Sequence, residues 1–157
     1  MDDKFMKYWL MKTEPNIFSW TDLEQKKIAS WEGVRNYQAR NYMRDQFQIG
    51  DKVLFYHSSC AEPGIAGIAK VVRGSYPDHT ALDQNGEYFD LASQKSGQSR
   101  WVMVDLSPIK KFSRFASLTE IRQHASLQSM QLLRKGQRLS IQPVMEFEFA
   151  EIESTWG

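Results

Sequence analysis

The fold is decided by two neighbouring stretches, Val53-Leu-Phe-Tyr-His57 and Ile65-Ala-Gly-Ile-Ala-Lys-Val-Val-Arg73. Both are rich in β-branched and aromatic residues, which are typical of β-strands. The seven residues from Ser58 to Gly64 connect them, so the pair is predicted to form a hairpin. Gly67 interrupts the second stretch, and a glycine inside a strand indicates a bulge or the close approach of another backbone.

Three more strands are expected around this hairpin. They cover residues 7–12, residues 101–106 with a continuation over 109–112 past Pro108, and residues 139–142. Between them, residues 74–99 contain many Gly, Pro, Asp, Asn and Ser residues. This composition predicts a long loop with room for one helical turn. Loops of that length inside a compact domain are often functional.

Short helices are predicted between and after the strands. They are expected at 22–27, capped by Ser19 or Thr21; at 42–47, as one or two turns; at 120–124, capped by Ser117 or Thr119; at 129–133; and at 146–152, with Pro143 placed to open the helix. The elements do not alternate as strand and helix, as a parallel α/β fold requires. The order predicts an α+β fold, either a small mixed barrel or a curled antiparallel sheet with peripheral helices.

Composition limits the classes of protein to which the chain can belong. Its 157 residues show neither an internal repeat nor a linker, so one domain over residues 1–157 is expected. The formal net charge is +1, and any affinity for nucleic acid must therefore come from local patches of charge. Cys60 is the only cysteine, which excludes an intrachain disulfide and fits a reducing compartment.

Nothing in the sequence indicates a membrane segment. There is no run of about 18 apolar residues, the length that a membrane span requires. The start, Met1-Asp-Asp-Lys-Phe-Met6, lacks the order of a positive and then an apolar region that marks a signal peptide. We therefore expect a cytoplasmic protein without a membrane partner.

Motifs for catalysis, metal binding and cofactor binding are not found. The three histidines, at positions 57, 79 and 124, lack the spacing of a metal site, and no glycine-rich phosphate loop occurs. His57 and Cys60 are close in sequence, but a Cys–His pair also needs a third group to orient the histidine. Glu14 and Glu32 are the available carboxylates for acid–base chemistry, and nothing beyond their position marks them. We expect no catalytic residue, no metal and no cofactor.

The function is best indicated by the stretch Trp31-Glu-Gly-Val-Arg-Asn-Tyr-Gln-Ala-Arg-Asn41, which has no clean hydrophobic period. Flat rings can stack on bases, guanidinium groups can bind phosphate, and amides can hydrogen-bond to the donor–acceptor edge of a base. Strand ends gathered beside it would complete a pocket with polar lips and aromatic sides. A plainer alternative stays open for each residue alone: Trp31 and Trp101 are core residues, and the arginines form surface ion pairs.

The chain resembles the EVE domain family, whose PUA-like fold is shared in outline with YTH domains. The matching segments run in order over nearly the whole chain: Tyr8-Trp-Leu-Met-Lys-Thr-Glu-Pro15, Trp31 to Asn41, Gly50-Asp-Lys-Val-Leu-Phe-Tyr-His-Ser58, Pro63-Gly-Ile-Ala-Gly67, Arg100-Trp-Val-Met-Val-Asp105 and Arg138-Leu-Ser-Ile-Gln-Pro-Val144. Together they are highly specific. Two mild departures are Thr13, where the family commonly has Ser, and Glu32, where it commonly has Asp.

This resemblance implies a PUA-like mixed β-barrel with short peripheral helices and a pocket at the strand ends. It implies a non-catalytic module that recognises a modified base, such as a methylated nucleotide, in DNA or RNA. The implied ligand-binding residues are Lys12, Thr13, Trp31, Gly33, Val34, Arg35, Asn36, Tyr56, His57 and Ser58, with Ser140 and Gln142 nearby. Flanking phosphates would be bound by Lys12, Arg35 and Arg40.

Two other classes of function stay open on the sequence. The first is a sensor of a small molecule or nucleotide fragment, because a nearly neutral protein with a pocket need not bind a polymer. Salt dependence separates it from a nucleic-acid binder, whose affinity falls steeply as salt rises. The second is an enzyme that acts on a modified base, which loss of turnover on changing His57 or Cys60 would favour.

Overall fold

The computed structural model describes residues 6–157. The expected domain starts at residue 1, so its first five residues lie outside the described part of the chain. The expectation that no signal peptide is present rests on residues 1–6 and falls almost entirely there as well. No helix between residues 6 and 157 has the length and apolar character that crossing a membrane requires.

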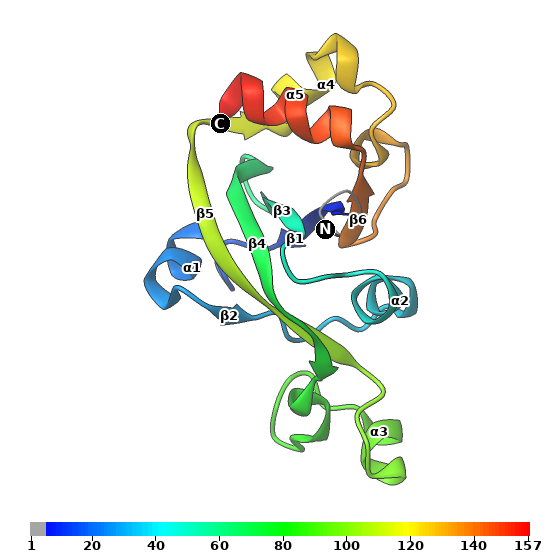
Figure 1. Ribbon diagram of the computed structural model, residues 1–157. Helices are drawn as coiled ribbons and strands as arrows, with labels where there is room; N and C mark the ends of the chain where they lie inside the picture. Colours follow the sequence, from blue (N-terminus) through cyan, green and yellow to red (C-terminus); the bar gives the residue numbers. More distant parts are fainter. Residues whose placement is uncertain (1–5) are drawn as a thin grey trace.

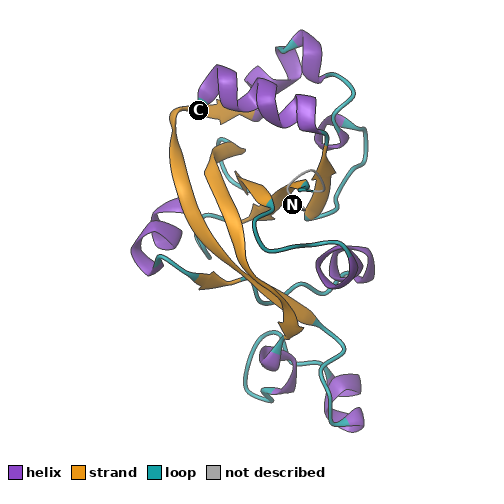
Figure 2. Cartoon of the chain, viewed as in Figure 1, coloured by secondary structure: helices purple, strands orange, loops and turns teal. Residues whose placement is uncertain are grey.

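The core of the fold is a mixed six-stranded sheet (Figures 1 and 2). Its strands are β1 (Tyr8–Thr13), β2 (Ala29–Ser30), β3 (Lys52–His57), β4 (Gly64–Pro77), β5 (Val102–Ser117) and β6 (Ile141–Val144). They lie in the order β2-β5-β4-β3-β1-β6. Only β1 and β3 pair in parallel among the described strands. The α+β prediction is confirmed, and the alternative of a purely antiparallel sheet is wrong.

The predicted hairpin is confirmed as the antiparallel pair β3–β4. Gly67 is paired with Lys111 of β5, next to a break in the strand register. A Cβ atom at Gly67 would lie 2.7 Å from the backbone oxygen of Lys110 and 2.8 Å from the Trp20 ring. The predicted close approach at this glycine is therefore confirmed, because only a residue without a side chain fits there.

β4 and β5 run well past the predicted strands and form a long twisted ribbon (Figure 1). The ribbon occupies residues 74–77, which were expected to begin a loop. At its far end a 3₁₀ turn (η2, His79–Leu82) and a short helix (α3, Leu91–Ser96) form a projecting arm. The predicted long loop therefore contains strand, turn and helix.

The remaining described helices surround the sheet (Figure 2). They are α1 (Trp20–Lys26), α2 (Tyr37–Asp45), α4 (Leu118–Gln123), α5 (Glu146–Trp156) and the 3₁₀ turns η3 (Ala125–Leu127) and η4 (Gln131–Leu133). Ser19 caps α1 in a capping box with Asp22, and Ser117 caps α4. In each case the first of the two predicted capping residues is confirmed. The predicted helix at 129–133 is reduced to η4.

Two predicted helix boundaries are wrong. α2 starts at Tyr37, five residues before the expected start, because the side chain of Asn36 caps it by accepting from the Ala39 N–H at 3.0 Å. Pro143 does not open α5 and lies in β6 opposite Trp9. Since β6 is an edge strand, the missing N–H of proline costs no ladder hydrogen bond there.

Two hydrophobic clusters occupy opposite faces of the central strands, and we name them the Trp31 cluster and the Trp156 cluster after a tryptophan in each. Along β1, Trp9 and Met11 point to the Trp31 cluster and Leu10 points to the Trp156 cluster, as the alternation of a strand requires. The Trp31 cluster also contains residues of α1, α2 and β2. The Trp156 cluster contains residues of α4, η3, η4 and α5, which cover it (Figure 1).

Candidate functional site

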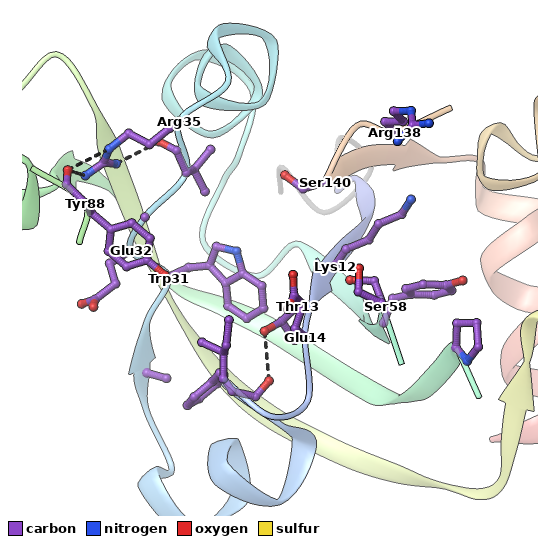
Figure 3. Close-up of a pocket in the computed structure, with 18 of the residues that line it drawn as sticks. Lys12, Thr13, Glu14, Trp31, Glu32, Arg35, Ser58, Tyr88, Arg138 and Ser140 are labelled. Carbon is purple, nitrogen blue, oxygen red and sulfur yellow. Dashed lines mark hydrogen bonds between the residues drawn. The ribbon is translucent and has the colours of Figure 1, made fainter. Parts of the chain in front are cut away.

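A cavity of about 740 Å³ opens where β1 and β3 end (Figure 3). Because these two strands are parallel, their carboxyl ends meet at the same edge of the sheet, with Lys12 beside Tyr56. Nine of the twelve predicted ligand residues line this cavity: Lys12, Thr13, Trp31, Gly33, Val34, Arg35, Tyr56, Ser58 and Ser140. The volume lies within the range of about 300–1,000 Å³ that small-molecule sites occupy.

Trp31 forms one wall of the cavity and is also a core residue. Only 7 % of its surface is exposed. Its ring meets the rings of Phe18 and Phe55 edge-on, with centroids 6.2 and 5.7 Å away, and its backbone N–H donates to the Val104 carbonyl at 2.7 Å. The ring is thus held from two sides while the indole points toward the middle of the pocket (Figure 3).

Lys12 supplies a half-buried positive charge to the pocket. Its Nζ atom lies 5.7 Å from the centre of the Tyr56 ring, and in the described chain it has no carboxylate within ion-pair distance. Burial lowers the pKa of the Lys12 amine from its usual value and raises the pKa of Tyr56 to about 12. An unpaired and poorly solvated ammonium is ready to bind an anion.

The loop from Gly33 to Arg35 is fixed by the buried carboxylate of Asp78. Asp78 accepts from the Gly33 N–H at 2.8 Å and from Arg35 Nη1 at 3.0 Å. Burial alone would raise the pKa of Asp78, but hydrogen bonds from Thr80, Gly33 and Arg35 outweigh it and hold the pKa below its usual range. Gly33 has a φ of 85° and lies against Tyr88, so a larger residue would not fit.

Arg35 has no donor to spare for a phosphate. Its guanidinium donates to Asp78, to Thr80, to the Val34 carbonyl and twice to the Tyr88 carbonyl, which uses all five N–H groups of an arginine. Figure 3 shows it turned toward Tyr88 at the edge of the pocket. Its geometry supports a positioning role for Arg35 and gives no support to the predicted phosphate contact.

Three predicted ligand residues are not brought to the pocket. Asn36 is used as the cap of α2. His57 accepts from the Trp20 backbone N–H at its Nε2 atom, and burial lowers its pKa, so it is neutral at pH 7. Gln142 is 1 % exposed, and its amide donates to the Leu139 carbonyl. Each has a structural task that the resemblance alone did not reveal.

Arg40 also lies outside the pocket lining. It is on α2, with its guanidinium 4.8 Å from the centre of the Tyr37 ring. Conversely, the pocket contains residues that the prediction did not include as ligand residues, among them Glu14, Phe18, Glu32, Tyr88 and Arg138. The two glutamates had been considered for acid–base chemistry, and Arg138 had been named in the matching segment 138–144. Tyr88 was missed because it lies in the segment that was expected to be a loop.

Comparison with known proteins identifies the family. The family model described as EVE domain matches residues 7–155. Thymocyte nuclear protein 1 from Gallus gallus is 42 % identical over 90 % of this chain and 65 % of its own length. The Homo sapiens protein of the same name is 40 % identical over 90 % of this chain and 70 % of its own length. The chain thus spans about two thirds of the length of these curated relatives.

Solved structures confirm the fold. The protein PSPTO5229 from Pseudomonas syringae superposes with a TM-score of 0.88 at 44 % identity, covering 94 % of this chain and 97 % of that one. Human THYN1 in complex with 5-methylcytosine-containing DNA superposes with a TM-score of 0.86 at 40 % identity, covering 94 % and 96 %. The curated relatives are named nuclear proteins, so they give no support to the expected cytoplasmic location.

Proposed function

Since this chain belongs to the EVE domain family, we propose that it binds DNA that carries a modified base and holds that base against Trp31. The observation that carries the proposal is the pocket: an aromatic wall, a half-buried ammonium and hydroxyl groups converge at the parallel strand ends. The human relative solved on 5-methylcytosine-containing DNA makes this base the first ligand to test.

The energetic account needs the base to leave its stack. Unstacking costs a few kcal/mol, and stacking on an aromatic side chain such as Trp31 returns about 1–3 kcal/mol. A buried methyl group adds about 0.8 kcal/mol, which corresponds to about a fourfold preference for the methylated base. Any stronger preference requires polar contacts to the edge of the base.

Polar groups that could contact the base are available in the pocket lining. The side chains of Ser58 and Ser140 and the carboxylate of Glu14 lie in the lining. A carboxylate accepts hydrogen bonds from the amino group of cytosine, so Glu14 is our candidate for that contact. The N–H of Gly33, one of the predicted ligand residues, is already bonded to Asp78 and is left out of the proposal.

Phosphate contacts in the proposal come from Lys12 and Arg138, which both line the pocket. Neither forms an ion pair within the described residues. Such contacts give affinity without base specificity. Because the global charge is only +1, these local cations would account for most of the salt dependence of binding.

The proposed role is non-catalytic, and one EVE domain over residues 1–157 would carry it. His57 and Cys60, the two side chains considered for nucleophilic chemistry, are both outside the pocket lining. His57 is also occupied as a hydrogen-bond acceptor. The proposal therefore assigns the site to recognition.

Fluorescence anisotropy with matched oligonucleotides tests the proposal. Single-stranded and duplex DNA would each be compared with 5-methylcytosine or cytosine at one position, over a range of salt concentrations. We expect at least fourfold tighter binding of the methylated strand and a steep loss of affinity with salt. Equal affinity for both bases would contradict modified-base recognition. Tight binding of free 5-methylcytidine with a flat salt response would favour the small-molecule sensor.

A further inference from the structure

An aromatic and guanidinium cluster lies next to the pocket, on α2 and in the two residues that precede β5. Tyr37 stacks on Trp101, with ring centroids 4.8 Å apart and planes inclined by 26°. Arg40 lies 4.8 Å from the Tyr37 ring, and Arg100 lies 5.6 Å from it. We call Tyr37, Arg40, Arg100 and Trp101 the Tyr37 platform.

The Tyr37 platform is joined to the pocket wall by direct contacts. Arg35, which lines the pocket, lies 5.5 Å from the Trp101 ring and 5.6 Å from the Tyr88 ring. Trp101 in turn carries Tyr37. Two contacts thus lead from the pocket lining to the exposed Tyr37 ring. Each nucleotide adds about 3.4 Å or more to the length of a strand, so neighbouring nucleotides of one strand can span the pocket and this ring.

Half of the Tyr37 surface is exposed, although the ring is large and apolar. Arg40 uses three N–H groups, two toward Asn41 Oδ1 and one toward the Arg100 carbonyl. An arginine has five, so two stay available. Within residues 6–157 Arg40 has no carboxylate at ion-pair distance, whereas Arg35 and Arg100 are paired with Asp78 and Asp90. The surplus positive charge of the platform is therefore on Arg40.

Hydrogen bonds to Asp90 hold Arg100 and Trp101 of the platform in place. Asp90 accepts two hydrogen bonds from the Arg100 guanidinium, at 2.8 and 3.0 Å, and one from the Trp101 indole at 3.1 Å. The hydrogen bonds from Arg100, together with those from Ser93, hold the pKa of Asp90 well below its usual range. Trp101 is 4 % exposed and acts as the base of the stack. A preordered surface loses less conformational entropy when it binds.

We propose that the Tyr37 platform binds a nucleotide that flanks the one in the pocket, with its base on Tyr37 and its phosphate on Arg40. This inference rests on the proposed function, because it needs a strand whose modified base is in the pocket. Stacking on an exposed aromatic ring tolerates any base, and an arginine fork matches phosphate. Continuity with the pocket favours a nucleic-acid strand as the occupant over an acidic protein.

The experiment compares two ligands, free 5-methylcytidine and a single-stranded 7-mer with 5-methylcytosine at its centre. Tyr37→Ala is expected to weaken binding of the 7-mer about tenfold, because a loss of this size matches the free energy that one stacked base contributes. It is expected to leave binding of the nucleoside within twofold. Tyr37→Phe keeps the ring and should restore most of the 7-mer affinity.

Arg40→Gln provides a second variant that does not depend on the aromatic stack. It should weaken the 7-mer and lower the slope of log affinity against log salt by about one unit. Arg44→Gln is its matched control, because Arg44 is on the same helix, carries the same charge and is paired with Asp45. The control should change the slope by much less.

The outcomes separate this inference from the proposed function. If the wild type prefers the methylated 7-mer but Tyr37→Ala and Arg40→Gln bind it as the wild type does, the platform is overturned and the pocket stands. If both variants weaken the nucleoside as much as the 7-mer, they act on the pocket, and the platform is again overturned. If the wild type binds neither ligand, both proposals fail. Should Tyr37→Ala not fold, Arg40→Gln decides alone.

Discussion

The Trp31 cluster and the Trp156 cluster lie on opposite faces of the same strands and have similar ingredients. Trp156 is 2 % exposed and Trp31 is 7 % exposed, so solvent exposure hardly separates them. What differs is the covering: α4 and α5 enclose Trp156, whereas Trp31 faces a cavity, which Tyr56 of the Trp156 cluster also lines. The comparison teaches that this fold makes its pocket by leaving one end of a core unfilled.

The largest expected effect on stability is that of Trp156→Ala. The ring projects from α5 into the Trp156 cluster, where it is buried, with the His124 ring 5.5 Å away. Its removal leaves a closed cavity, which should cost about 3–5 kcal/mol in the free energy of unfolding. Chemical denaturation measures this cost. The folded fraction should bind the methylated oligonucleotide normally, and a selective loss of binding would break the contrast between the clusters.

Trp31→Ala should show the reverse pattern. Because the ring already faces an open cavity, its loss should cost less stability than Trp156→Ala, about 1–3 kcal/mol. Binding of the methylated oligonucleotide should fall about 5- to 150-fold, the equivalent of a lost stacking contact of about 1–3 kcal/mol. Thermal melting and anisotropy on the same sample test both parts. A protein that unfolds as fully as Trp156→Ala would show that Trp31 is only a core residue.

Lys12→Met should move stability and binding in opposite directions. Burial disfavours the charged amine, so replacing it should leave the folded protein as stable or more stable. Oligonucleotide binding should weaken for methylated and plain strands alike, and the salt slope should fall by about one unit. Salt titrations monitored by anisotropy, with thermal melts alongside, measure both effects.

The lowered pKa of Lys12 gives this prediction a pH signature. Between that pKa and the ordinary lysine pKa of about 10.4, the unfolded chain holds a proton that the folded chain has released. Over this window the contribution of Lys12 to stability rises with pH, while its contribution to DNA affinity falls. Lys12→Met should lack both trends. If the affinity of Lys12→Met depends on pH in the same way as that of the wild type, Lys12 is not part of the binding site.

Cys60→Ser should have the smallest effect. Cys60 lies in the loop between β3 and β4, outside the pocket lining. Oligonucleotide affinity should stay within about threefold of the wild type, a change below about 1 kcal/mol. A larger loss in a variant that melts normally would revive a covalent or catalytic role for the thiol.

Much of the sheet could be predicted because local patterns agree with it. The β3–β4 hairpin, the cap at Ser19 and the close approach at Gly67 all follow from residue types at short range. The start of α2 was missed because only two residues of this helix, Ala39 and Met43, are buried. Two buried positions do not make a recognisable period, and the cap at Asn36 was the available signal.

The extension of β4 and β5 was missed for a different reason. Beyond Arg73 the burial pattern alternates between intermediate and exposed, because the ribbon pairs mainly with itself and projects away from the core. No single stretch of sequence encodes such mutual pairing. Tyr88, which the resulting arm brings to the pocket, was therefore out of reach of any local argument.

Most of the predicted ligand residues line the cavity, and the direction of the side chain decides which of them do not. Lys12, Tyr56 and Ser58 line the cavity because parallel strands end together. His57 follows Tyr56, and successive side chains of a strand point to opposite faces. It therefore reaches the Trp20 backbone instead of the pocket. A family resemblance shows which residues correspond along the sequence, whereas the direction of each side chain has to come from the structure.

The most direct test of the central claim observes the two clusters in one experiment. The indole N–H signals of ¹⁵N-labelled protein, assigned with Trp31→Phe and Trp156→Phe, would be followed by NMR during titration with a single strand carrying 5-methylcytosine and with its cytosine counterpart. We predict that the Trp31 signal shifts with the methylated strand, and less with the plain one at equal concentration, while the Trp156 signal stays in place. Binding that leaves the Trp31 signal unmoved, or that shifts Trp156 equally, would contradict a base-binding pocket at the open end of the Trp31 cluster.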